Sequence, residues 1–433
     1  MQGKRMMVAM VAMFTVMALL IGPLGAMGAD QTEKLIEILI KKGIITKEEA
    51  DSLEKEINKE ETKPEEKMVK QEVTPKEDWT KKIEVGYKNG AYIKTVDDQF
   101  SLKLNVNLQG LFNYDGLEGS PNKSTFRVRR ARLIPSGNAF YPWLKYYVQL
   151  TLEDSVNLRD AYVEAAYFNW LTPRIGQYKV PFDREFLTSA FNLQLIDRSM
   201  VNNEFNLGRD IGLQVSGQPI GDFLDYRLGI FNGSGANQVN VDKKYMYVGR
   251  LVFSPFGPVP YSQGAVGKPG KPLLSVGVAG AWMPDLKPGE RKSLAGVLGS
   301  TQEVPVMSDI FQLTSDIAFQ YQNFSLEGAY YYRTIDPKEP TKFGKQNASG
   351  YFAQGGYFLI PKHLEVAARY SFMDPDTPTK VDDNKRKEMA AGVSYYFFGH
   401  PLKIQGNYSF FRTEASPHSL DEHLAQVQLT FAF

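Results

Sequence analysis

From residue 81 onward, apolar and polar residues alternate with a period of two, which is the pattern of a β-strand with one apolar face. The segment FSLKLNVNLQGLFNYD places one apolar set on a single face: Leu102, Leu104, Val106, Leu108, Phe112 and Tyr114. The alternation recurs in LKYYVQLTLED, FQLTSDIAFQYQ, HLEVAARYSF and LKIQGNYSFF, and turn-rich stretches such as NGSGAN and DPDTPT separate the segments. The pattern predicts an all-β fold of consecutive antiparallel strands.

The length and aromatic content of these segments favour a membrane barrel over a soluble β-sandwich. The segments are about ten residues long, and Tyr and Phe lie near the ends of their apolar faces, as in the aromatic girdles of outer-membrane barrels. The final segment, AQVQLTFAF, alternates to a terminal aromatic, Phe433, which looks like the assembly signal of bacterial outer-membrane barrels. An open sheet edge in lipid would leave backbone groups unpaired. We therefore predict a closed transmembrane antiparallel β-barrel over residues 81–433.

The first 80 residues have a different character. Residues 1–29 combine a positive start, an apolar run and small residues near a cleavage point, which predicts a secretory signal peptide rather than a membrane anchor. Residues 30–60 carry apolar residues at helical spacing, with Thr46 and Glu49 in a capping box, and predict a short, coiled-coil-like helical module in the periplasm. Residues 61–80 are charged and contain proline, so we interpret them as a linker.

Composition narrows the classes of function. The 433 residues include no cysteine, which excludes disulfides, thiolate catalysis and cysteine-ligated metal. The mean hydropathy is −0.32, and no apolar run beyond the first 30 residues reaches the length of a membrane helix. The histidines are scattered and match no metal or catalytic motif: His363, His400, His418 and His423. We expect no enzyme activity, no cofactor and no nucleic-acid partner, and an outer-membrane location.

The segment FRVRRARL carries four arginines inside a predicted strand. Strict alternation would place Arg127 and Arg129 on one face and would turn Arg130 and Arg132 to the other, although an arginine facing lipid at the bilayer midplane costs about 2–4 kcal/mol. A β-bulge near Arg129–Arg130 would shift the phase and turn all four arginines to the lumen, and we predict this bulge. The lipid-facing set would then be Phe126, Val128, Ala131 and Leu133. The alternative is a basic patch at the headgroup level or at an exterior rim.

A second candidate site is the segment 183–208, about 26 residues without strand alternation. So long an irregular segment in a compact barrel usually has a function, and we predict that it folds into the pore. Four cations in or beside it are candidates for lining the pore: Lys179, Arg184, Arg198 and Arg209. Alternatively, the three arginines form ordinary ion pairs with neighbouring acidic residues, namely Asp183, Glu185, Asp197, Glu204 and Asp210.

Several motifs together resemble the phosphate-selective porin O/P family. FRVRRARL is followed by LRDAY at 158–162, RIGQYKVPFDRE at 174–185 and IDRS at 196–199. The later segments LEVAARYSFMDPD and YYFFGHPLKIQGNYSF are also similar to that family, so the resemblance covers roughly residues 81–433. It implies a sixteen-stranded barrel, usually trimeric, in which inward-folded loops narrow each pore and basic residues guide phosphate.

The resemblance also bears on individual arginines and on the solute. It implies that the pair Arg129 and Arg130 lies at the pore, whereas Arg132 occupies a position that need not be basic in relatives. We predict a homotrimer in the lipid bilayer that lets phosphate or other small anions diffuse passively, because guanidinium groups offer paired N–H donors to phosphate oxygens. The alternative is a general, non-specific porin whose N-terminal module tethers the envelope through contact with the cell wall.

Overall fold

The computed structural model describes the following residues: 82–240, 243–287, 306–339, 344–375, 384–414 and 418–433. The predicted signal peptide, helical module and linker lie outside these residues. Within the described residues, no helix combines the length and the apolar character needed to cross a membrane.

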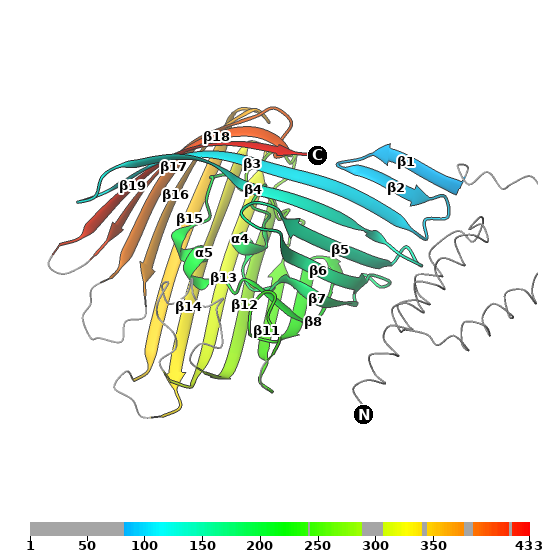
Figure 1. Ribbon diagram of the computed structural model, residues 1–433, viewed down its shortest axis with the longest axis horizontal. Helices are drawn as coiled ribbons and strands as arrows, with labels where there is room; N and C mark the ends of the chain where they lie inside the picture. Colours follow the sequence, from blue (N-terminus) through cyan, green and yellow to red (C-terminus); the bar gives the residue numbers. More distant parts are fainter. Residues whose placement is uncertain (1–81, 241–242, 288–305, 340–343, 376–383, 415–417) are drawn as a thin grey trace, which may run out of the picture. The chain divides into compact units, whose positions relative to one another are not determined.

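Sixteen antiparallel strands close into a barrel (Figure 1), as predicted. The first eight are β3 (Ser101–Leu117), β4 (Lys123–Asn138), β5 (Leu144–Thr151), β6 (Asn157–Ala165), β7 (Thr172–Lys179), β8 (Arg209–Gly217), β10 (Leu224–Phe231) and β11 (Met246–Phe253). The last eight are β12 (Leu273–Leu286), β13 (Ser308–Tyr321), β14 (Phe324–Pro337), β15 (Gln346–Ile360), β16 (Leu364–Asp374), β17 (Arg386–Tyr396), β18 (Leu402–Thr413) and β19 (Leu420–Ala432). The barrel closes where β19 pairs with β3. This pairing gives both strands a neighbour on each side, as a lipid environment requires.

Three short strands stand outside the ring of sixteen. The hairpin of β1 (Ile83–Tyr87) and β2 (Ala91–Thr95) pairs with the first residues of β3. The third, β9 (Pro219–Asp222), lies in the turn between β8 and β10. The described chain therefore enters the barrel through a small sheet extension of β3.

Alternation sorts side chains between the two faces of the wall. Along β13, Phe311, Leu313 and Ile317 are exposed on the outer face, whereas Gln312 and Asp316 are buried in the lumen. The barrel therefore has an apolar exterior and a polar interior, which is the inverse of a soluble protein and the expected arrangement in lipid.

The predicted bulge in β4 is present. Arg130 pairs with Gln109 and Val128 pairs with Gly110, so the register shifts by one residue and Arg129 is the extra residue on β4. Phe126 and Val128 are exposed, at 84% and 61%, on the outer face. After the bulge, Arg130 and Arg132 lie opposite Gln109 and Asn107, which face inward from β3. The bulge therefore shifts the alternation of β4 by one residue.

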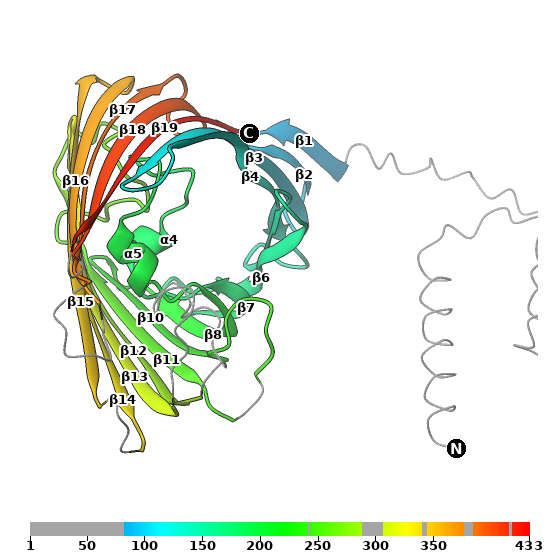
Figure 2. The same cartoon turned by 60° about the vertical axis from the view of Figure 1, so that its left-hand side comes forward.

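Two connections fold back into the barrel instead of running over its rims. The inner loop, residues 180–208, joins β7 to β8 and contains α4 (Arg184–Leu187) and α5 (Met200–Phe205), which lie within the ring of strands (Figure 2). The side chains of Asp183 and Ser199 cap the two helices by accepting backbone N–H bonds. The second connection, residues 254–272, joins β11 to β12.

Apolar contacts and buried hydrogen bonds hold both connections in place. Phe205 of the inner loop is fully buried and stacks on Tyr331 of β14 at a ring distance of 5.5 Å. In the second connection, Gln263 donates its backbone N–H to the carbonyl of Asn192, and its side chain accepts the N–H of Gln194. The two connections therefore support each other inside the barrel.

The two connections leave one side of the lumen more open than the other. Inward-facing residues of β13, β14 and β18 are fully buried, for example Gln312, Arg333 and Lys403. The inward-facing Asn105 and Asn107 of β3 are partly exposed. The open part of the lumen therefore runs along the wall that begins at β3 and β4.

Candidate functional site

A cluster of basic side chains lines the open side of the lumen. We define the basic cluster as Arg129, Arg130, Arg132, Arg159, Lys179, Arg198 and Arg209. The cluster joins residues from β4, β6, β7, the inner loop and β8. Four of its positive charges lie close enough to Arg130 to repel it, and three act on Lys179 in the same way, of which Arg132 and Arg198 belong to both sets. Like charges at such separations destabilise one another unless an anion lies between them.

The two register shifts in this wall each turn an arginine inward. The bulge in β4 has Arg129 as its extra residue. In β6, Asp160 pairs with Gln149 and Leu158 pairs with Leu150, so Arg159 is the extra residue of a second bulge. Sequence reasoning missed Arg159, because strict alternation with the inward-facing Asp160 would turn it to lipid. The available signal was its place in the LRDAY motif.

The arginines of β4 meet different partners. Arg129 forms an ion pair with Asp197 of the inner loop, and Arg130 donates to the amide oxygen of Gln109 at 2.8 Å. The guanidinium of Arg132 lies over the ring of Phe191, 5.3 Å from its centre. Arg127 is exposed and acts on Arg129 through its charge.

Lys179 and Arg198 are held by neutral oxygens. Lys179 donates to the carbonyls of Leu187 and Thr188 at 3.0 and 3.1 Å. Arg198 donates to the carbonyls of Glu185 and Thr188 at 3.0 and 2.7 Å. Burial removes water from the Arg198 guanidinium and lowers its pKa. The carbonyls partly replace the hydration that it loses.

Arg209 and Arg184, the other two residues that the sequence predicted to line the pore, form ion pairs with carboxylates. Arg209 pairs with Asp160 at 2.9 Å and belongs to the basic cluster. Arg184 is 2% exposed, donates to the carbonyl of Val259 and lies 3.7 Å from Glu327. These partners lie on the second connection and on β14, so Arg184 contacts the filled side of the lumen.

The contrast with other lumen arginines distinguishes the basic cluster. Carboxylate pairs hold the arginines of the filled side: Arg250 with Asp316, Arg333 with Glu204 and Arg369 with Glu388. Within the described part of the chain, five members of the basic cluster form no such pair: Arg130, Arg132, Arg159, Lys179 and Arg198. The Nε atoms of Arg132 and Arg159 are buried without a hydrogen-bond acceptor. Uncompensated positive charge is therefore concentrated where the lumen is open.

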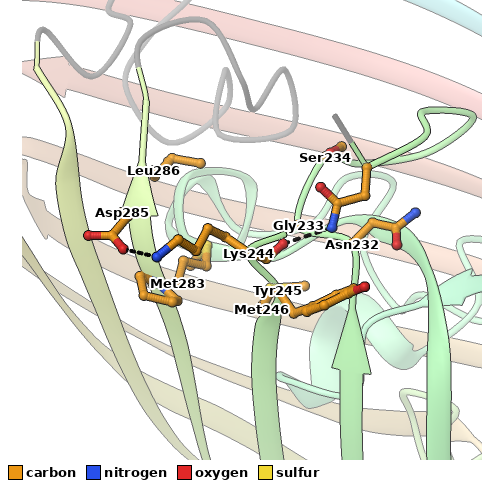
Figure 3. Close-up of a pocket in the computed structure, with 11 residues that line it drawn as sticks. Asn232, Gly233, Ser234, Lys244, Tyr245, Met246, Met283, Asp285 and Leu286 are labelled. Carbon is orange, nitrogen blue, oxygen red and sulfur yellow. Dashed lines mark hydrogen bonds and ion pairs between the residues drawn. The ribbon is translucent and has the colours of Figure 1, made fainter. Parts of the chain in front are cut away.

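A separate hollow lies between the start of β11 and the end of β12 (Figure 3). Lys244 and Asp285 form an ion pair across it, and Asn240 donates to the carbonyl of Lys244 at 2.8 Å. Because its cation is matched by a carboxylate, this hollow lacks the excess charge of the basic cluster. Among the described residues, no three His, Cys, Asp or Glu side chains gather as a metal site requires.

A model of the phosphate-selective porin O and P family matches residues 102–282 and 298–433. The chain belongs to this family. The protein is therefore an outer-membrane porin. Both its family and its barrel fold are those of channel proteins. Comparison with curated proteins gave no match.

Solved porins share the fold at low sequence identity. An anion-selective porin from Comamonas acidovorans is 12% identical, with a TM-score of 0.55 over 76% of this chain and 99% of that one. OmpF of Salmonella typhi, in complex with daunomycin, is 12% identical, with a TM-score of 0.51 over 78% of this chain and 100% of that one. OprB of Pseudomonas putida is 10% identical, with a TM-score of 0.51 over 77% of this chain and 94% of that one. These similarities concern the barrel fold.

Proposed function

We propose that this porin passes anions in preference to cations, with phosphate or a related oxyanion as the favoured solute, and that the basic cluster is its anion-binding constriction. The observation that carries the proposal is the partner of each lumen arginine. Arginines on the filled side have carboxylates, whereas five cations of the basic cluster have none among the described residues. The family name and the anion selectivity stated for the porin of Comamonas acidovorans agree with this assignment.

The chemistry of the basic cluster suits an oxyanion. A phosphate entering a narrow pore loses water, and guanidinium groups replace that water with paired N–H donors. Arg130 and Arg159, which are both partly exposed, carry such donors. Several weak sites in series allow entry and release, whereas one tight site would hold the ion. Flow follows the concentration gradient.

The test is conductance of the refolded barrel in planar bilayers. The reversal potential in a KCl gradient reports anion preference, and added phosphate should block chloride current. The double variant Arg130→Gln with Arg159→Gln should weaken that block by about tenfold or more, since each charged hydrogen bond contributes about 1.5–3 kcal/mol. Arg227→Gln is the matched control, because Arg227 already pairs with Asp225 at 2.9 Å. Cation preference without phosphate block would leave a general porin.

We further propose a homotrimer, as the resemblance implies, with residues 1–29 as signal peptide, 30–60 as a periplasmic helical module and 61–80 as a linker. The sequence patterns of these segments support the assignment. Deleting residues 30–80 tests the contact of the module with the cell wall and its part in assembly. Unchanged trimers and an unchanged envelope would exclude both roles.

A further inference from the structure

One aromatic ring lies at the centre of three cations of the basic cluster. Phe186, at the end of α4, is half-buried in the lumen. Its ring centre is 5.4 Å from the ammonium of Lys179, 5.2 Å from the guanidinium of Arg198 and 5.9 Å from that of Arg209. All three distances are within the range in which the negative face of an aromatic ring attracts a cation.

The backbone around Phe186 supplies the other contacts of two of these cations. Lys179 and Arg198 both donate to the carbonyl of Thr188, and Arg198 also donates to that of Glu185. The turn Glu185–Thr188 therefore holds both cations with a ring and with carbonyl dipoles. Neither partner carries a full negative charge, so the net positive charge of the cluster is retained.

The same inner loop contains an aromatic ring with a different setting. The ring of Phe205 lies 4.9 Å from the guanidinium of Arg333, and Arg333 also pairs with Glu204 at 3.1 Å. Here the carboxylate cancels the charge and the ring adds packing. The comparison separates the two ways in which the loop holds an arginine, and it provides a natural control.

A carboxylate and an aromatic ring can both stabilise a buried cation, but they have different effects on its charge. Burial makes a cation costly, and a carboxylate removes the cost by cancelling the charge. A ring attracts the cation through its face and leaves the N–H donors at the guanidinium edge available to a solute. A pore that selects anions needs cations stabilised by aromatic rings at its constriction, because their positive charge is retained.

We propose that Phe186 is a positioning residue for anion selectivity. Its ring holds Lys179 and Arg198 close together beside the pore, next to the Arg209–Asp160 pair, and leaves the charge of Lys179 and Arg198 uncancelled. The inference rests on the proposed function, because it assigns the means by which the basic cluster stays both ordered and positive. Phe186 itself acts through these cations and need not touch the solute.

The test compares Phe186→Leu, Phe186→Trp and the control Phe205→Leu in the full barrel, by phosphate block and by reversal potential. Phe186→Leu keeps apolar bulk but removes the ring face, and should weaken phosphate block about fivefold and reduce anion preference. Phe186→Trp should restore or exceed the wild-type block, because indole attracts cations most strongly. Phe205→Leu should leave the block unchanged.

The outcomes separate the two proposals. If wild-type current shows no phosphate block, the proposed function and this inference fail together. If wild-type block is present and Phe186→Leu retains it, or if Phe205→Leu loses it equally, the inference alone fails. Should Phe186→Leu not refold, Phe186→Trp decides, since a block weaker than wild type would overturn the role of the ring.

Discussion

At the scale of single residues, Asp197 decides how much charge β4 presents to the pore. Its carboxylate pairs with Arg129 and also accepts from Gln426 at 2.9 Å, and its side chain is 32% exposed. Asp197→Asn keeps an amide oxygen for Gln426 but frees the charge of Arg129. We expect phosphate block to strengthen by about threefold to tenfold, on the order of 1 kcal/mol. Unchanged block in the titration of chloride current with phosphate would contradict a role for Arg129 in anion binding.

Asp183 predicts a pH dependence of selectivity. Burial raises the pKa of its carboxyl to about 7, and its charge acts on Arg198. Because the folded-state pKa lies above the ordinary value, protonation stabilises the loop below about pH 7, and this stabilisation is lost as the pH rises through 7. Ionisation also adds a negative charge near the basic cluster, so anion preference should fall between pH 5 and pH 9.

The matched variant for this effect is Asp183→Asn. Asparagine is a good helix N-cap and can accept the backbone N–H of Phe186 as the carboxylate does, at 2.7 Å in the wild type. Reversal potentials in KCl gradients avoid the titration of phosphate itself. The variant should keep its anion preference across the pH range, and a slope equal to that of the wild type would exclude Asp183 as its source.

At the scale of elements, the strands and one bulge could be predicted from the sequence, and the reason is the cost of charge in lipid. Four arginines in FRVRRARL cannot share one face without a phase break, so the break near Arg129 was predictable. The bulge at Arg159 has one arginine beside Asp160, which leaves the direction of the phase undecided. The inner loop was predictable from its length and its loss of alternation.

The partners of the inner loop could not be predicted, because they come from distant strands. Glu388 on β17 accepts the backbone N–H of Met200 at 2.9 Å and pairs with Arg369 on β16. Arg369 in turn donates to the carbonyls of Asp197 and Arg198 at 2.9 and 3.3 Å. Only the closed barrel brings these residues together, and the inward course of residues 254–272 depends on the same closure.

This buried pair leads to a prediction about the loop. Glu388→Gln leaves Arg369 buried without its carboxylate, which costs about 3–5 kcal/mol for a buried pair. The barrel strands should still form, but the inner loop should detach from β16 and β17. Single-channel recordings should then show larger and noisier currents. Adding Arg369→Gln should reduce the current noise, because it removes the unpaired charge. Wild-type currents in Glu388→Gln would show that the pair does not hold the loop.

At the scale of the whole molecule, the two inward connections make the lumen asymmetric. They bury the polar residues of β13, β14 and β18, and they leave the wall with the uncompensated arginines facing the open space. Fixed positive charge along a narrow, water-filled passage raises the local concentration of anions. The net charge of the chain, +1, gives no sign of this arrangement, because it does not record which cations have a carboxylate partner: Arg250, Arg333 and Arg369 of the filled side are paired.

The absence of cysteine from the sequence makes this asymmetry directly measurable. Asn107→Cys and Lys145→Cys place a thiol on inward positions of β3 and β5 that are at least partly exposed. Ser394→Cys places one on β17, at an inward position that is 4% exposed. A charged methanethiosulfonate reagent should reduce the current of the first two variants within its ordinary reaction time. The third variant and the cysteine-free wild type should stay unmodified, whereas equal reaction on both sides would mean that the passage is central and the connections do not fill the β17 side.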